Sequence, residues 1–436
     1  MKVTTPRSIL FGTAALALSL LAIMPARAAL QVDITESADG AVPIAISPFA
    51  SSGQALPLDM AQVASDDLES TGLFDVLDRD SMVATPSDPD EVNYQNWRSA
   101  SVDNLVVGSA EANGSGGYRI RFDLLDVYQG RSSSSFQLNA GGNELRDAAH
   151  TIANLVYEKF IGEKGYFLSR IAYITMAQES GGLRYRLIVS DYDGYNPATV
   201  YSSRDPIMSP AWSPDGSKLA YVAFDVDRGR SSLRVQDLAS GNIREISARE
   251  GINGAPAWSP DGDALALTLS YRGSPDIYRY DLNTNQLTQL TNNGAIDTEA
   301  TWSPDGQHIA FTSDRGGKPQ VYRMRRDGSQ VERMTYDGES NQRADFSPDG
   351  DKLAMVQKSG NGFRIAVQDL ENNNIRIVSE GPLDDSPNFA PNGQAIMFAK
   401  QGRNNELATV TIDGETKTRL SQSGEVREPA WGPLGY

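Results

Sequence analysis

The chain contains no cysteine and only two histidines, His150 and His308. Without cysteine it can form no disulfide, thiol nucleophile or thiolate metal site, and two histidines exclude a histidine-rich metal site. The sequence also lacks a Gly-x-Ser-x-Gly nucleophile elbow and a phosphate-binding P-loop. We therefore expect no catalytic residues, no bound metal and no cofactor, and we expect that the chain is not an enzyme.

Positive charge is scarce as well. The chain has 39 lysine and arginine residues against 56 aspartate and glutamate residues, which gives a net charge of −17. Nonspecific binding to nucleic acid or to anionic lipid needs positive patches, so neither is expected as a partner.

Long apolar runs are absent except near the start, where one runs from Ile9 to Met24 behind Lys2 and Arg7. Ala26-Arg27-Ala28 follows with the small-x-small pattern that signal peptidase cleaves. The run is short for a membrane anchor, so we interpret residues 1–28 as a cleaved signal peptide. Its removal would change the net charge to −20, and the mature chain is predicted to lie in the periplasm without membrane insertion.

A repeated motif dominates the rest of the sequence. Its copies are Trp212-Ser-Pro-Asp-Gly216, Trp258-Ser-Pro-Asp-Gly262, Trp302-Ser-Pro-Asp-Gly306, Phe346-Ser-Pro-Asp-Gly350, Phe389-Ala-Pro-Asn-Gly393 and Trp431-Gly-Pro-Leu-Gly435. Successive copies start 46, 44, 44, 43 and 42 residues apart. A period in the forties, with a turn and an apolar strand in each copy, is typical of a four-stranded, WD40-like propeller blade.

The repeats predict six blades over residues 166–436. An additional apolar strand, Ile171–Thr175, precedes the first copy of the motif and has no inner strand before it. The last inner strand, Pro429–Trp431, has no strand after it. Joining the two would close the ring and hide two strand edges. The repeated aromatic residue could stack on a ligand, but its recurrence in every blade favours packing between blades.

Residues 29–161 show no such period and predict a small α+β domain. The expected strands are 44–46, 74–77, 105–107, 118–127 and 136–138, and the expected helices are 58–70 and a helix that Asn143 caps and that runs to Phe160. The fold class is therefore an α+β N-terminal domain followed by an all-β six-bladed β-propeller closed by the C-terminal strand.

Two short acidic motifs could suggest calcium, Asp191-Tyr-Asp193-Gly194 and Asp225-Val-Asp227. Neither continues with the glutamate of an EF-hand loop, so we interpret both as surface turns. His308 occupies a repeat position that Lys218 and Lys352 hold elsewhere, which indicates a solvated residue.

Acidic residues precede every inner strand. They are Asp205, Glu250, Asp297, Glu299, Glu339, Asp345, Asp384, Asp385 and Glu428. Four arginines accompany them, Arg204, Arg249, Arg343 and Arg427. These segments are expected at one mouth of the central channel, either as a solvated rim or as a polar docking face. Asp297 and Glu299 are expected to be exposed.

The chain resembles the TolB family of the Tol–Pal envelope system. The resemblance rests on the order of a signal peptide, a small domain and six repeats, and on segments such as 161–174, 208–222 and 253–258. It implies a non-catalytic module that links the outer-membrane lipoprotein Pal with TolA and supports outer-membrane integrity and constriction at cell division.

The resemblance also implies positions for both partners. Pal would bind the propeller mouth, at Met208, Asn253, Thr298 and Glu299, to which we add Asp297 from the acidic segments. Ile252 stands where some relatives have a polar residue, so its role is open. TolA would bind the N-terminal segment Leu30, Gln31, Val32, Asp33, Ile34, Thr35 and Glu36.

Two enzymatic alternatives remain. The repeats also occur in the regulatory propellers of oligopeptidases, although a hydrolase domain would need roughly a further domain of sequence. A propeller enzyme with a site on its axis is the other alternative, and assays on peptide and ester substrates would separate both from a binding module.

Overall fold

A computed structural model describes residues 30–34, 40–51, 55–114, 116–360, 362–402, 405–420 and 425–435, and of residues 30–34 it describes the backbone alone. The predicted signal peptide and its cleavage position lie outside the described residues, as do Thr35 and Glu36. None of the helices in these ranges is both long and apolar enough to cross a membrane.

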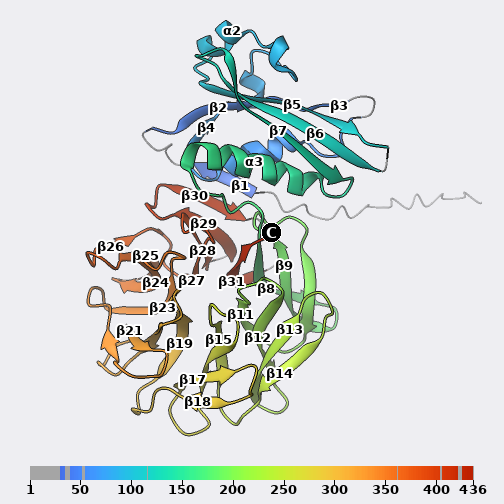
Figure 1. Cartoon of the computed structure of the whole chain (residues 1–436). Coiled ribbons are helices and arrows are strands. Elements are labelled where there is room, and N and C mark those ends of the chain that lie inside the picture. Colours follow the sequence, from blue (N-terminus) through green and yellow to red (C-terminus); the bar gives the residue numbers. More distant parts are fainter. Residues whose placement is uncertain are drawn as a thin grey trace, which may run out of the picture.

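Six antiparallel sheets form the blades of a propeller within the described residues (Figure 1). The first contains β31 (Glu425–Leu434), β8 (Ser169–Glu179), β9 (Gly182–Asp191) and β10 (Ala198–Ser203). The second contains β11 (Ile207–Trp212), β12 (Lys218–Asp225), β13 (Arg230–Asp237) and β14 (Ile243–Ser247). The third contains β15 (Asn253–Trp258), β16 (Ala264–Leu269), β17 (Asp276–Asp281) and β18 (Leu287–Gln289).

The remaining blades repeat this order. The fourth contains β19 (Asp297–Trp302), β20 (His308–Ser313), β21 (Gln320–Arg325) and β22 (Glu332–Arg333). The fifth contains β23 (Ser340–Phe346), β24 (Lys352–Ser359), β25 (Gly362–Asp369) and β26 (Ile375–Ile377). The sixth contains β27 (Asp384–Phe389), β28 (Ala395–Lys400), β29 (Glu406–Thr411) and β30 (Thr416–Leu420).

The ring closes through the last strand, as the sequence predicts. Strand β31 pairs antiparallel with β8, with Trp431 opposite Ile171 and Ala430 opposite Ala172. The first blade therefore takes its inner strand from the far end of the chain, and the predicted closure is confirmed.

The repeated aromatic residues pack between blades and also form part of the wall of a cavity bounded by the inner strands. Trp212, Trp302 and Trp431 are each less than a tenth exposed. In the copies with the sequence Trp-Ser-Pro-Asp-Gly, the aspartate holds the turn. After Trp212, Ser213 Oγ donates to Asp215 Oδ1 at 2.6 Å and the Ser217 amide donates to the same oxygen at 3.0 Å. These hydrogen bonds lower the pKa of Asp215 to about 2. The motif thus encodes both the turn and the contact between blades.

The N-terminal domain is a mixed sheet covered by helices (Figure 1). Its sheet runs in the order β4 (Phe74–Val76), β2 (Val42–Ile46), β5 (Asn104–Ala112), β6 (Gly117–Asp126) and β7 (Arg131–Gly141), and β3 (Ala50–Ser51) pairs with β5. The helices are α1 (Met60–Glu69), α2 (Tyr94–Ser99) and α3 (Leu145–Ile161), with 3-10 turns at Arg79–Ser81 and Pro89–Glu91. The predicted strands and both predicted helices are present, and α2 is additional.

One local prediction is wrong. Asn143 was expected to cap α3, but the N-cap residue is Glu144, which makes no capping hydrogen bond with its side chain. The Glu144 carboxylate instead accepts from the amide of Gly141 at 2.7 Å. The last residue of β7 thus binds the carboxylate of Glu144, so this carboxylate does not cap the amides at the start of α3.

Helices α1 and α3 lie between the sheet and the propeller (Figure 1). One continuous apolar cluster includes Ile44 of the sheet, Val156 of α3, and Met397 and Trp431 of the propeller. The ring of Tyr166, in the connection between α3 and β8, packs edge-on against Trp431 at 5.1 Å between centroids. The two parts of the chain therefore share a core.

The described part of the N-terminal segment, residues 30–34, is bound to the propeller. Strand β1 (Leu30–Ile34) pairs antiparallel with β30, from Leu30 opposite Leu420 to Ile34 opposite Thr416. It forms a fifth strand at the outer edge of the sixth blade. The sequence pattern did not predict this pairing.

Candidate docking site at the mouth of the propeller channel

The six inner strands share one irregularity. Each breaks its register with the next strand at the same repeat position, as β11 does between Met208 and Ala211 and β19 between Thr298 and Thr301. The residue inside each break has a positive φ although it is not glycine: Ser209, Ala255, Glu299, Arg343, Ser386 and Glu428, with φ between 43° and 56°. Non-glycine residues seldom adopt this conformation, and β-bulges of this kind often re-aim side chains at functional sites.

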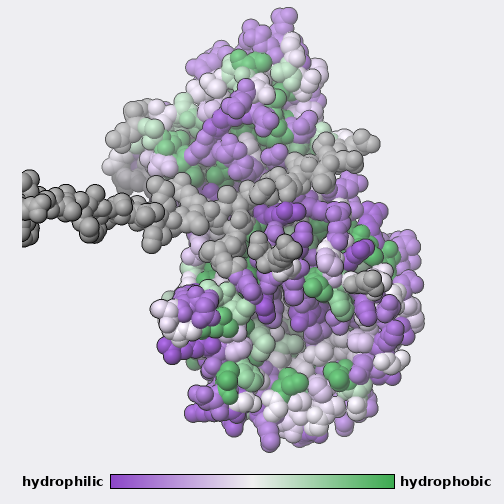
Figure 2. Space-filling model, turned by 180° about the vertical axis from the view of Figure 1, so that it is seen from behind, coloured by the Kyte–Doolittle hydropathy of each residue, from purple (hydrophilic) through white to green (hydrophobic). Residues whose placement is uncertain are grey.

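These six residues all line one cavity of about 680 Å³. Its wall includes residues from the inner strands of all six blades, so it lies at the mouth of the central channel. Seen from behind, the propeller surface is mostly hydrophilic, with hydrophobic residues in small separate patches (Figure 2). The wall of the cavity combines polar side chains, such as Glu299 and Arg343, with many apolar ones, among them the repeated aromatic residues. The cavity is an opening of mixed polar and apolar character bounded by backbone bulges.

Arg343 joins three blades at this mouth. Its Nε donates to Glu299 Oε1 at 2.9 Å, and its Nη1 donates to Ser386 Oγ at 2.7 Å and lies 3.4 Å from Asp385. Its backbone amide also donates to Glu299 Oε2 at 3.2 Å. The guanidinium thus neutralises part of the acidic mouth, as the sequence suggested, and orients Glu299.

Two further carboxyl groups in the wall have raised pKa values. Burial raises the pKa of Glu428, although the amide of Ser209, which donates to Glu428, acts in the opposite direction. Burial raises the pKa of Asp345 to about 7, although Asp345 Oδ2 accepts from the Phe389 amide at 2.8 Å. The mouth is consequently less negative near neutral pH than the residue count implies.

The structure brings together most of the predicted site residues. Met208, Asn253, Thr298 and Glu299 all belong to the wall of the cavity, and Met208, Thr298 and Glu299 are half-buried there. Of the acidic residues predicted at the mouth, Glu299, Asp345 and Glu428 line the cavity, while the described side chains of Asp205, Glu250, Glu339, Asp384 and Asp385 are not part of its wall.

The expected exposure of Asp297 is wrong. Its side chain is fully buried, where Oδ2 accepts from Arg315 Nη2 at 2.8 Å and from Asn293 Nδ2 at 2.9 Å. Glu299 is also less open than expected, with 25% of its side chain exposed. Asp297 begins its strand with the side chain turned into the blade, while the bulge turns Glu299 to the channel.

Asp297 belongs to a repeated structural position. Asn253, Asp297, Asn341 and Asp384 occupy equivalent places in successive repeats, and each is at most 1% exposed. Asn253 Nδ2 donates to Arg249 O at 2.8 Å, and Asn341 Nδ2 donates to Asp337 O at 2.6 Å. These side chains tie down the segments that lead into the inner strands. Asn253 therefore contributes to the mouth as a buried residue that fixes the segment before β15.

Sequence reasoning missed Ser209, Ala255 and Ser386 as members of the mouth. Their position in the repeat could have identified them, because each bulged residue stands three positions before the repeated aromatic residue. Ile252 is the large apolar side chain in the wall that reaches solvent, with 48% exposed.

The remaining candidates have mixed outcomes. Asp225 ends β12 and Asp227 lies in the exposed turn that follows it, as predicted. Asp191 to Gly194 do not form a surface turn: Tyr192 and Asp193 are 3% and 5% exposed. Their burial comes from the N-terminal domain, which packs over this turn. His308 is half-buried rather than fully solvated.

Comparisons with known proteins cover nearly the whole chain. Residues 30–133 match the family model described as the TolB amino-terminal domain, and residues 157–435 match that of the TolB beta propeller domain. A Methylococcus capsulatus protein named "Tol-Pal system protein TolB" is 53% identical over 95% of this chain and 97% of its own. A protein of the same name from Xanthomonas campestris is 44% identical over 93% of each.

A solved structure agrees with this similarity. The crystal structure of TolB from Acinetobacter baumannii aligns with a TM-score of 0.85 and 37% identity, and covers 93% of this chain and 100% of its own.

Proposed function

The chain belongs to the TolB family, and we propose that it is a non-catalytic, periplasmic binding module of the Tol–Pal system. In this role it links the outer-membrane lipoprotein Pal with TolA and supports envelope integrity and constriction at cell division. The observation that carries the proposal is the channel mouth, to which all six blades contribute a bulged residue.

Pal is proposed to dock at this mouth. The hydrogen bonds of Asp297, Asn253 and Arg343 hold the rim in place before any partner arrives. A rim that is already ordered loses little conformational entropy on binding. Glu299 and Thr298 present polar groups to the cavity, while Ile252 offers an apolar contact at its edge. An exposed apolar anchor beside ordered polar groups is a common composition of interface hot spots.

A matched pair of variants tests the location. Ile252→Asp places a charge at the mouth, and Ile243→Asp makes the same change on the outer strand β14, where the side chain is 45% exposed. Titration calorimetry with the soluble domain of Pal is expected to show at least tenfold weaker binding for Ile252→Asp and wild-type binding for Ile243→Asp. Equal affinities in the two variants would place the docking face elsewhere.

TolA is proposed to bind the N-terminal segment, residues 30–36. In the structure the backbone of β1 pairs with β30 along one edge. TolA would therefore either add to the remaining edge of β1 or take the segment from the propeller, and both are forms of strand addition. The two routes differ in whether β1 must leave β30, which a covalent lock can test.

The absence of catalysis is a proposal with its own test. Glu428 and Asp345 are carboxyl groups with raised pKa values in a cavity, the kind of group that catalysis uses. Purified protein is expected to show no turnover of peptide, ester or glycoside substrates. Turnover that Glu428→Gln abolishes would favour an enzyme with a site on the propeller axis.

A further inference from the structure

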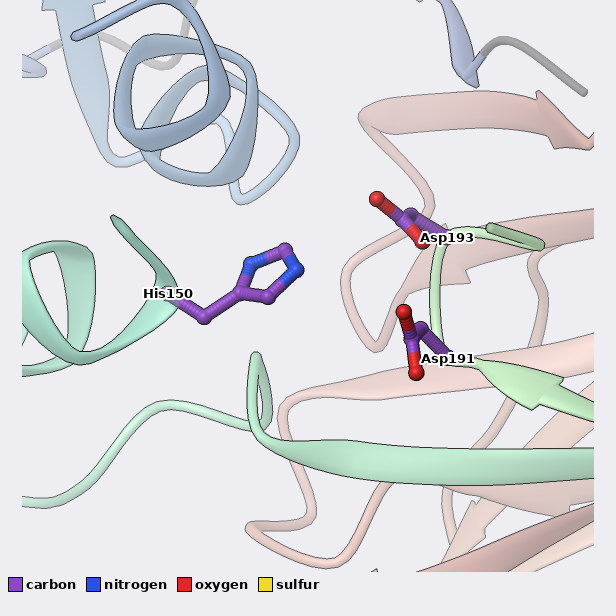
Figure 3. A group of neighbouring side chains, drawn as sticks. All are labelled: His150, Asp191 and Asp193. Atoms are coloured by element: carbon purple, nitrogen blue, oxygen red, sulfur yellow. The ribbon is translucent and has the colours of Figure 1, made fainter. Parts of the chain in front are cut away.

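Three side chains meet where the N-terminal domain contacts the first blade (Figure 3). His150 projects from α3, and its ring points toward the carboxylates of Asp191, at the end of β9, and Asp193, in the turn that follows. One potential ligand atom from each residue lies within 4.8 Å of the other two. His150 and Asp193 are 2% and 5% exposed, and Asp191 is half-buried.

One ring nitrogen of His150, Nδ1, already has a hydrogen-bond partner. Nδ1 lies 2.7 Å from Oδ2 of Asp67, and Oδ1 of Asp67 accepts from the hydroxyl of Tyr192 at 2.5 Å. When the ring is neutral, a carboxylate that accepts from Nδ1–H leaves the lone pair on Nε2. This carboxylate–imidazole arrangement is the one that supports metal-bound histidines.

Nε2 is buried and has no hydrogen-bond partner among the described residues. A buried polar atom without a partner is uncommon and requires an explanation. The two carboxylates that Nε2 faces already accept other bonds, Asp191 from Asn196 Nδ2 at 2.9 Å and Asp193 from Arg146 and from the Tyr195 amide. An added cation would give Nε2 its first partner and would join it to both carboxylates. An added anion would be repelled.

The charges around the cluster favour a divalent cation. Asp66, Asp67, Asp191 and Asp193 lie in this region, and Arg146 is the basic residue that pairs with Asp193. The arrangement therefore holds more negative than positive charge in a desolvated place.

We propose that His150 Nε2 and the carboxylates of Asp191 and Asp193 form a Zn²⁺ site that joins the N-terminal domain to the propeller. Zn²⁺ accepts imidazole nitrogen together with carboxylate oxygen, whereas Ca²⁺ and Mg²⁺ prefer sites made of oxygen alone. Three protein ligands leave a fourth, tetrahedral position for water. Asp193 can also keep Arg146, because a carboxylate offers about four acceptor positions.

The site replaces the sequence-based expectation of no metal. That expectation relied on the small number of histidines and on interpreting Asp191–Gly194 as a surface turn. One histidine suffices here because the two carboxylates reach it from another domain. Metal binding would stabilise the contact between the domains, since a ligand that binds only the folded arrangement shifts the equilibrium toward it.

The test uses untagged full-length mature protein, stripped with a chelator and titrated with Zn²⁺ in a calorimeter. The expected result is saturable binding of one Zn²⁺ per chain and a higher midpoint of thermal unfolding. The chain offers a matched control, because His308 is its only other histidine. His150→Gln is expected to abolish the binding and the thermal shift, whereas His308→Gln is expected to retain both.

Two more variants guard against loss of folding. Asp191→Asn keeps the shape of a half-buried side chain and removes one ligand charge, so it is expected to weaken Zn²⁺ binding at least tenfold while unfolding in chelator like the wild type. Asp67→Asn removes the group that positions His150, and about 10–100-fold weaker binding is expected. Co²⁺ in place of Zn²⁺ should give a visible absorption band that His150→Gln lacks.

Two results would contradict the proposal. No saturable Zn²⁺ binding by the wild type would overturn the proposal and leave His150 as a protonated partner of Asp67. Binding that His150→Gln and Asp191→Asn both retain would place any metal elsewhere in the chain.

Discussion

The indole Nε1 of Trp212 donates a hydrogen bond to the carbonyl oxygen of Ala430 at 3.1 Å, although 218 residues separate them. The same bond joins Trp258 to Ala211 at 3.1 Å and Trp302 to Ala257 at 3.2 Å. These three tryptophans thus bind the inner strand of the preceding blade, whereas the indole of Trp431 donates to Ser169 Oγ of its own blade at 2.8 Å. The seam between the last strand and the second blade uses the same contact as the seams between the second and third and between the third and fourth blades.

Removal of the closing strand is expected to destabilise the whole ring. A variant that ends before Glu428 loses the inner strand of the first blade, the acceptor for Trp212 and the ring of Trp431. Thermal unfolding should become broader and begin at much lower temperature, because an exposed edge replaces a seam. Trp212→Phe, which removes this hydrogen bond and part of a buried ring but keeps the closing strand, should cost about 1–3 kcal/mol. An unchanged melting curve for the truncated chain would contradict the closure argument.

Neighbouring residues of β19 should separate scaffold from docking face. Trp302→Ala should lower the free energy of unfolding by about 3–5 kcal/mol as a large core truncation. Asp297→Ala should also destabilise, by about 1–3 kcal/mol or more, since it leaves Arg315 without its buried partner. Glu299→Ala should weaken Pal binding with a smaller effect on stability. Calorimetric unfolding and Pal titration would measure both quantities, and wild-type Pal binding by Glu299→Ala would remove Glu299 from the docking face.

Stability should fall as the pH rises toward 7 because of Asp345. Its pKa is raised from 3.8 to about 7, so the folded state holds this proton more tightly than the unfolded chain. The favourable contribution is complete below the unfolded pKa and is lost as pH rises through the folded pKa, with a slope of at most about 1.4 kcal/mol per pH unit. Asp345→Asn should lack this component. Parallel stability–pH curves for the variant and the wild type would show that Asp345 does not titrate in this range.

A reversible lock tests whether β1 must leave β30. Val32 and Thr418 are opposite each other in the antiparallel pair, and opposed residues in such pairs are close enough for a disulfide. Because the chain has no cysteine, Val32→Cys with Thr418→Cys can form one disulfide only. If TolA takes the segment from the propeller, oxidation should reduce TolA binding and reduction should restore it. Equal binding in both redox states would favour addition to the remaining edge of β1.

A shortened chain tests the same segment more simply. A variant that starts at Gly40 should retain the propeller and its Pal binding but lose TolA binding. Circular dichroism would check the fold, and surface plasmon resonance with TolA would measure the affinity. Full TolA affinity without residues 30–39 would show that TolA binds another part of the chain.

The repeats explain why the propeller could be predicted in detail. Each Trp-Ser-Pro-Asp-Gly copy encodes a turn through local hydrogen bonds, such as those of Ser213 with Asp215, and fixes a contact between blades through its tryptophan. The count of strands before the first copy and after the last one then predicted the closure. The strands of the N-terminal domain followed from alternation of apolar and polar residues.

What could not be predicted depends on contacts between distant segments. The turn at Asp193 resembles any exposed turn until Asp67 accepts from Tyr192, 125 residues away. Asp297 appeared exposed because its partner, Arg315, comes from the next hairpin. The pairing of β1 involves five residues without a turn or a neighbouring strand to indicate it. Local patterns carry no information about such partners.

The use of β31 to complete the first blade also imposes an order on folding. Synthesis runs from the N-terminus, so β8, β9 and β10 must wait without an inner partner while the other five blades are made. Strand β1, the earliest described part of the chain, waits for β30, which is also made late. Until synthesis is almost finished, the chain therefore carries β1 without a partner and β8 with one open edge. During this interval proteases and holding chaperones have most access to both strands.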